Sequence, residues 1–116
     1  MDSALPAAGL KDLLLLFLGK RRLFKVIGNS MLPCLQPEQR IVAKEHNKNS
    51  PIPDIGSIVV CRHPSESKMV ITKRVKAIEG TFLELRGDNQ DQSIDSRHFG
   101  KLSIDHIIGV AESTVG

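Results

Sequence analysis

One lysine stands where a buried apolar side chain is expected. Residues 68–78 are rich in Val and Ile and read as a strand, in which side chains alternate between two faces. One face combines Lys73 with the apolar residues Met69, Ile71, Val75 and Ala77. If that face is buried, desolvation lowers the pKa of the Lys73 amine, and a neutral amine is a usable general base. Alternatively, Lys73 reaches the rim of the sheet or pairs with a carboxylate such as Asp88 or Asp95.

A candidate nucleophile lies upstream, where the apolar segment 23–27 ends. Gly28 permits backbone angles that are closed to other residues, and Ser30 follows it at the turn. A serine there can present its hydroxyl and its own N–H to a cleft. By itself, the pattern is more typical of simple turn chemistry or a helix cap.

The elements that must position these residues are mostly strands. Apolar, β-branched segments separated by turn residues lie at residues 23–27, 40–44, 57–62, 69–78, 81–85 and 104–111. Glu79 and Gly80 predict a tight hairpin between two of them. Only residues 10–19 read as a helix, which Gly19 can end. The polar segment 87–100 is long enough to be a functional loop.

Composition excludes several classes of protein. The chain has 116 residues, of which 41% are hydrophobic and 25% charged, as expected for one globular domain. A net charge of +3 and only 3% aromatic residues give little support to nucleic-acid binding. Cys34 and Cys61 cannot form a disulfide framework, which favours a reducing compartment. These two thiols and His63 are scattered ligands without a paired motif, so neither a metal nor a cofactor is expected.

The longest apolar run, residues 13–18, is far shorter than the roughly 20 residues of a membrane-spanning helix. Its basic cluster, Lys20 to Arg22, follows the run, whereas in a secretory leader it would precede it. We therefore expect a cytoplasmic protein. A remaining alternative is peripheral membrane contact, with residues 10–18 lying flat on an anionic surface.

Four blocks, taken in order, resemble the type I signal peptidase family (peptidase S26) of serine-lysine proteases. They are residues 28–35, 56–64, 72–75 and 87–100, the last with Gly-Asp-Asn followed by Ser-x-Asp-Ser-Arg. The resemblance covers about residues 23–111. It implies a mainly β, compact signal-peptidase/LexA-like fold with one short N-terminal helix. Residues 1–22 would form the N-terminal helix and basic segment, and residues 23–116 a single catalytic domain.

The resemblance also implies roles for individual residues. Ser30 is the nucleophile and Lys73 the general base, a variant of the serine protease triad. Ser93 orients the lysine, while structural support comes from Asp88, Asp95 and Arg97. The N–H of Ser30 is one oxyanion donor. Some family members use a hydroxyl two residues before the nucleophile; Gly28 stands there, which leaves a backbone group or the Asn29 side chain.

The implied partner is a precursor protein. Within the family, the chain resembles most the soluble branch that removes a pro-segment from nickel-type superoxide dismutase. The resemblance lies in its small size, its short apolar run and the sequence of residues 30–35. One alternative is signal-peptidase-like processing of exported precursors at a membrane surface. A second, non-enzymatic alternative is a basic β-domain that binds an anionic partner or nucleic acid through residues 20–25 and 40–48.

Overall fold

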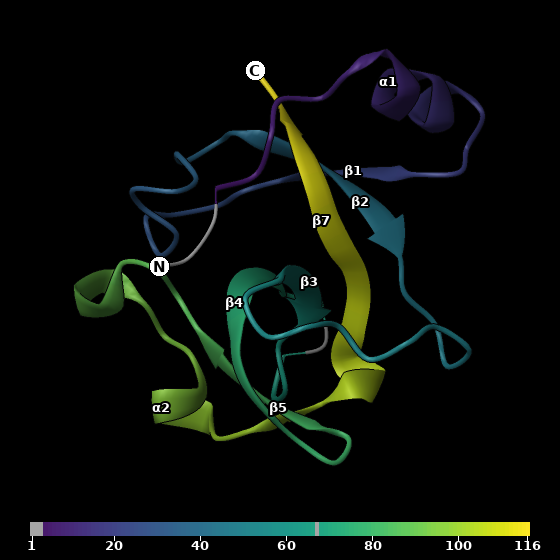
Figure 1. Ribbon diagram of the computed structural model, residues 1–116. Helices are drawn as coiled ribbons and strands as arrows, with labels where there is room; N and C mark the ends of the chain where they lie inside the picture. Colours follow the sequence, from purple (N-terminus) through teal and green to yellow (C-terminus); the bar gives the residue numbers. More distant parts are fainter. Residues whose placement is uncertain (1–3, 67) are drawn as a thin grey trace.

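The computed structural model describes residues 4–66 and 68–116. Seven antiparallel strands form one sheet in the order β1-β2-β7-β3-β4-β5-β6. The strands are β1 (Arg22–Lys25), β2 (Arg40–Glu45), β3 (Ile58–Arg62), β4 (Val70–Glu79), β5 (Phe82–Arg86), β6 (Leu102–Ser103) and β7 (Ile107–Val115). Figure 1 shows the sheet strongly twisted, with β7 running through its middle. The expected mainly β fold is confirmed.

Short helices interrupt the strands. They are α1 (Leu10–Phe17), η1 (Gln90–Gln92), α2 (Ser96–Phe99) and η2 (Ile104–His106). Helix α1 matches the expected helix, and Gly19 follows it with a φ of 74°, a backbone conformation that suits glycine. The polar segment 87–100 is a loop, as expected, although it contains η1 and α2. The expected strand at residues 104–111 is wrong at its start. There the Ser103 hydroxyl accepts a hydrogen bond from Asp105 N (3.2 Å) and caps η2.

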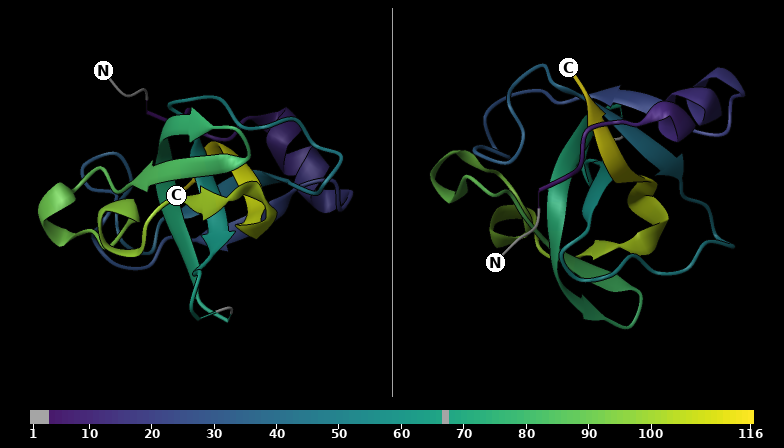
Figure 2. Two further views of the ribbon diagram at one scale, coloured as in Figure 1. Left: turned by 90° about the horizontal axis from the view of Figure 1, so that it is seen from below. Right: turned by 45° about the horizontal axis from the view of Figure 1, so that its top comes forward.

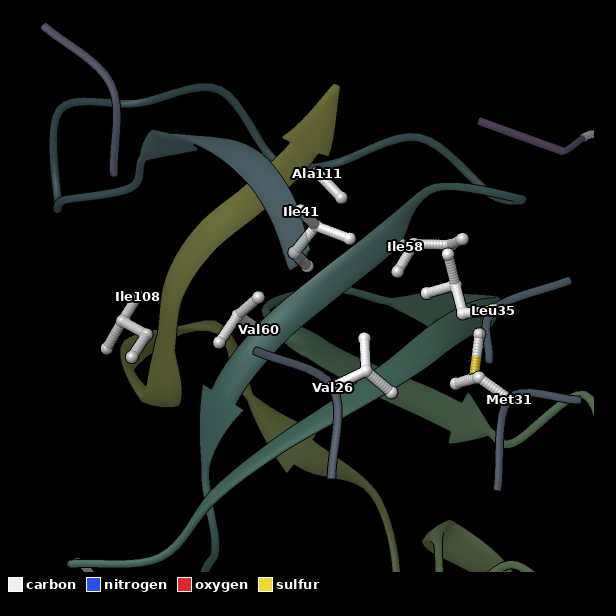
Figure 3. Close-up of a cluster of buried hydrophobic side chains, with 8 residues drawn as sticks. All are labelled: Val26, Met31, Leu35, Ile41, Ile58, Val60, Ile108 and Ala111. Carbon is white, nitrogen blue, oxygen red and sulfur yellow. The ribbon is translucent and has the colours of Figure 1, made fainter. Parts of the chain in front are cut away.

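The central strand β3 is buried on both faces. Ile58 and Val60 pack in one apolar cluster, whose members Figure 3 labels. Val59 and Cys61 point to the opposite face and pack in a second cluster. This two-sided burial explains the continuous apolar run of the strand, because a strand covered on one face only would alternate.

Strand β4 has a partner on each side along only part of its length. It pairs with β3 over residues 70–74 and with β5 over residues 74–79. Glu79 lies opposite Phe82, so the expected hairpin at Glu79 and Gly80 is confirmed. Residues 70–73 therefore pair with β3 alone, and their other edge carries no strand among the described residues.

The N-terminal segment lies along β7. Ala7 bridges Thr114, Ala8 N donates to the carbonyl oxygen of Thr114 (2.8 Å), and Arg21 pairs with Glu112 (2.6 Å). Figures 1 and 2 show α1 at the periphery of the molecule. No residue of α1 is buried. Within residues 4–66 and 68–116, no helix has the length and apolar character that crossing a membrane requires.

Candidate active site

Lys73 lies in the buried row that the alternation of β4 predicts. Its neighbours on that face are Val75, which is fully buried, and Ile71, which packs against the same cluster. Across the ladder Lys73 faces Val59. Only 4% of Lys73 is exposed, so its amine is withdrawn from water in an apolar setting.

A chain of hydrogen bonds continues from the Lys73 amine into the 87–100 loop. Nζ lies 3.0 Å from Ser93 Oγ, which in turn lies 2.8 Å from Asp95 Oδ2. The Asp95 carboxylate is fully buried and also accepts from Gly87 N (2.9 Å) and from Arg97 Nε (3.0 Å). The resemblance implied this grouping of Lys73, Ser93, Asp95 and Arg97, and the structure brings the four residues together.

The surroundings shift the pKa values of the two ionisable ends of this chain. Burial lowers the pKa of Lys73, and the negative charge of Asp95 offsets part of that effect. Burial alone would raise the pKa of Asp95, but the hydrogen bonds from Arg97, Gly87 N and Ser93 outweigh it and lower that pKa. The amine is therefore shifted toward its neutral form, and the carboxylate toward its ionised form.

The ionised Asp95 fixes the direction of the hydrogen bonds. An ionised Asp95 can only accept hydrogen bonds, so the Ser93 hydroxyl donates its single hydrogen bond to Asp95. Ser93 Oγ then accepts a hydrogen bond from Lys73 Nζ. When the amine is neutral, this arrangement leaves its lone pair available for another partner. The arrangement suits a general base.

The Ser30 turn is anchored in the core. Gly28 has a φ of 81°, in the left-handed region that favours glycine. Leu32 N donates to the carbonyl oxygen of Asn29 (3.2 Å), and Leu35 N to that of Met31 (2.9 Å). Met31 and Leu35 are fully buried in the first apolar cluster, which holds the half-buried Ser30 above it.

Ser30 and Lys73 line one pocket of about 180 Å³. Its remaining walls are apolar for the most part: Ile27, Met69, Val70, Ile71 and Thr72. No hydrogen bond joins Ser30 to Lys73 among the described residues. The two groups thus open into the same small, largely apolar space, and Lys73 is held there through Ser93.

Gly87 allows three segments to meet at the pocket. A Cβ at this position would lie 2.2 Å from Ser93 Oγ and 2.6 Å from the carbonyl oxygen of Ser30. No side chain fits there without a displacement of backbone. The next contact is Asn89 N, which donates to the carbonyl oxygen of Ser30 (2.8 Å). Sequence reasoning gave Gly87 no role, although its position before Asp88 in the Gly-Asp-Asn block was the available signal.

Gly28 and Asn29 come directly before Ser30 in the same turn, and among the described residues neither forms a hydrogen bond with Lys73. The Asn29 side-chain nitrogen donates to Gln92 Oε1 (3.1 Å), and the Asn29 carbonyl oxygen accepts from Asn89 Nδ2 (3.1 Å). The Asn29 side chain therefore ties the Ser30 turn to the 87–100 loop.

Asp88 belongs to a polar group around Arg74, on the other face of β4. Arg74, 1% exposed, donates to both carboxylate oxygens of Asp88 (2.9 and 2.8 Å), to the carbonyl oxygen of Gly56 (2.8 Å) and to Cys34 Sγ (3.2 Å). Burial tends to raise the pKa of Asp88, but the Arg74 hydrogen bonds outweigh it and lower that pKa. Asp88 thus supports the loop through Arg74 and not through Lys73, a role of Arg74 that sequence reasoning missed.

The thiols and the histidine considered as scattered ligands lie in different settings. Cys61 is buried in the second cluster, and burial raises its pKa to about 12. Cys34 contacts Arg74, whereas the His63 ring packs edge-on against the Phe99 ring, with 5.4 Å between the ring centroids. Among the described residues no three Cys, His, Asp or Glu side chains converge.

Comparison with known proteins places this geometry in a family. A family model described as signal peptidase, peptidase S26, matches residues 2–87, a range that includes Ser30, Lys73 and Gly87. The mitochondrial ATP-independent inner membrane protease subunit 1a of Arabidopsis thaliana is 31% identical over 110 residues, covering 74% of this chain. The chain spans 65% of the length of that relative. Since the family match extends over well more than half of the 116 residues, the chain belongs to the signal peptidase family, peptidase S26.

Proposed function

We propose that the protein is a serine endopeptidase in which Ser30 is the nucleophile and Lys73 the general base. The observation that carries the proposal is a buried amine, held by Ser93, in the pocket that Ser30 also lines. Family membership supports the peptidase class. The lowered pKa of Lys73 supports its role as base, because only the neutral amine can take a proton.

The chemistry would proceed by acyl transfer. Lys73 takes the hydroxyl proton as Ser30 Oγ attacks the peptide carbonyl carbon, and the N–H of Ser30 stabilises the oxyanion. The protonated amine then gives its proton to the leaving nitrogen, which breaks the peptide bond and leaves an acyl-enzyme. Lys73 next deprotonates a water that hydrolyses the ester and regenerates Ser30.

The free edge of β4 would hold the substrate as an added strand. His63 N donates to the carbonyl oxygen of Met69, and Gly56 N to that of Val75, so the odd-numbered residues bond toward β3. In an antiparallel ladder the alternate residues, Val70 and Thr72, direct their N–H and C=O groups the other way. That edge borders the pocket, which suits an extended peptide ending at Ser30.

Removal of a pro-segment from a nickel-type superoxide dismutase precursor, in the cytoplasm, is the substrate assignment we propose. The sequence of residues 30–35 supports this assignment. A second candidate is processing of precursors at a membrane surface. The name of the Arabidopsis relative, an inner membrane protease subunit, favours it.

Co-expression of the chain with the dismutase precursor, followed by intact-mass measurement, tests both levels of the proposal. We expect loss of the pro-segment with the wild type and no cleavage with Ser30→Ala or Lys73→Ala. Matched controls are the exposed residues Ser65→Ala and Lys76→Ala, which should cleave normally.

Cleavage by the Ser30→Ala or Lys73→Ala variant, with circular dichroism spectra like the wild type, would refute the dyad. An intact dismutase precursor beside a cleaved exported precursor would instead reject only the substrate assignment. Strong, salt-sensitive polyanion binding without any cleavage would favour the non-enzymatic alternative.

A further inference from the structure

Helix α1 turns an apolar face to solvent. Its members follow the helical spacing i, i+3, i+4, i+7 and i+8, and all of them are exposed: Leu10, Leu13, Leu14, Phe17 and Leu18. Leu10 is 83% and Phe17 87% exposed. We call these five residues the α1 outer face.

The opposite side of α1 is apolar as well. Leu15 and Leu16 are half-buried there, against the body of the protein. A helix that is apolar around most of its circumference is normally covered on all sides. Within the described part of the chain nothing covers the outer face, and Figure 2 shows α1 projecting from the molecule.

The charges around this face are positive. Lys11 in α1 and Lys20 just after it are exposed, whereas Lys25 on the following strand lies 4.0 Å from the Glu38 carboxylate. The acid of α1, Asp12, is half-buried and accepts a hydrogen bond from Gly9 N (2.9 Å). Glu112 is engaged by Arg21 (2.6 Å). An apolar stripe flanked by cations complements a surface that offers both an apolar layer and negative charge, such as an anionic lipid surface.

The size of the face argues against a second copy of the chain. Eight residues make a helix only about 12 Å long. A stable protein interface buries roughly 800 Å² on each partner, more than one such helix can offer. A lipid surface needs no matching shape and accepts a short helix parallel to its plane.

We propose that α1 docks the protein on an anionic lipid surface. The α1 outer face would enter the boundary between headgroups and acyl chains, with Lys11 and Lys20 beside the headgroups. This goes beyond the peptidase function and does not depend on it.

Co-sedimentation with vesicles tests the docking. The probes are vesicles of phosphatidylcholine with or without phosphatidylserine. The wild type should bind the mixed vesicles, and the Leu10→Gln/Phe17→Gln double variant should bind them roughly a hundredfold more weakly, since each buried side chain contributes at least about tenfold. Lys11→Glu/Lys20→Glu should weaken binding only where phosphatidylserine is present. The matched control is Ile55→Gln, a 65% exposed isoleucine outside this face.

Several results would overturn the docking. They are no binding by the wild type, an equal loss in Ile55→Gln, or equal binding to vesicles with and without phosphatidylserine. A wild-type dimer that Leu10→Gln/Phe17→Gln converts to a monomer in sedimentation velocity would assign the face to a second copy instead. Cleavage of a water-soluble peptide should be the same in the double variant and the wild type, so the docking and the peptidase function can fail separately.

Discussion

Lys73 combines two demands that oppose each other. Burial makes the amine available as a general base, because it shifts the amine toward its neutral form, but an amine in an apolar cluster still needs a hydrogen-bond partner. Ser93 supplies that partner without supplying a charge. Asp95 lies one residue further along the chain of bonds, where it can hold Ser93 without forming a direct ion pair that would keep the lysine protonated.

This arrangement predicts the effect of Ser93→Ala. The change removes the acceptor of the Lys73 amine and leaves the walls of the pocket intact, because Ser93 does not line it. We expect kcat to fall about a hundredfold, as for a misplaced catalytic group, with KM little changed. Steady-state kinetics on a peptide substrate measures both.

Ser96→Ala is the control for that variant. It lies in the same loop and loses one hydrogen bond, from Leu85 N (2.8 Å), but does not touch Lys73. Its kcat should stay near the wild-type value. Equal losses in both variants would mean that Ser93 acts only by stabilising the loop.

At the scale of elements, Gly87 sets how closely the Ser30 turn approaches the 87–100 loop. In Gly87→Ala the new Cβ would overlap Ser93 Oγ and the carbonyl oxygen of Ser30, so the two segments must separate. Overpacking of this kind costs about 1 to 3 kcal/mol of stability. We expect cleavage to fall at least about tenfold, because the shift moves both the nucleophile and the group that orients the base. Thermal unfolding and kinetics together check this prediction.

Gly9→Ala provides the matched substitution. A Cβ at Gly9 would come no closer than 3.9 Å to another atom. Both stability and activity should be nearly unchanged there. Full activity in Gly87→Ala would show that the close approach of the two segments is unnecessary.

Local patterns predicted some of these elements and missed others. The two-residue alternation was sufficient to group Lys73 with apolar side chains, because that period belongs to any strand, but it left open whether the lysine is buried or reaches the rim of the sheet. The burial of Arg74 on the opposite face could not be read in the same way. It depends on Cys34, Gly56 and Asp88, which come from three distant segments. Helix η2 was missed because its cap, Ser103, follows an apolar residue that also suits a strand.

At the scale of the whole molecule, the Asp95 cluster links the site to stability. Its carboxylate has a pKa below that of the unfolded chain, so the ionised form stabilises the fold. That contribution is complete above the unfolded pKa of about 4 and is lost as the pH falls through the folded value. We expect the free energy of unfolding of the wild type to decrease steeply below about pH 4.

Asp95→Asn should remove this acid dependence. Near neutral pH the variant should lose about 3 kcal/mol, because Arg97 keeps its charge without an ionised partner. The difference from the wild type should shrink as the pH falls. Urea unfolding across this pH range measures both, and parallel curves for the two proteins would contradict the assignment.

The arrangement of strands across the molecule could not be predicted from local patterns. The segments were largely identified, but their order, with β7 between β2 and β3, depends on long-range pairing. The exposure of α1 was foreseen only in the alternative of peripheral membrane contact, since an apolar helix is usually packed. The site depends on this long-range order, because Ser30, Lys73 and Ser93 come from three separate parts of the chain.

The central claim is that burial shifts Lys73 toward its uncharged form, and an NMR titration of the lysine side chains tests it most directly. The Lys73 signal can be assigned by its disappearance in Lys73→Ala. We expect it to titrate below the ordinary lysine pKa of about 10.4, and the cleavage rate to rise with pH through the same value. A Lys73 signal that titrates together with the exposed lysines would contradict the proposed mechanism.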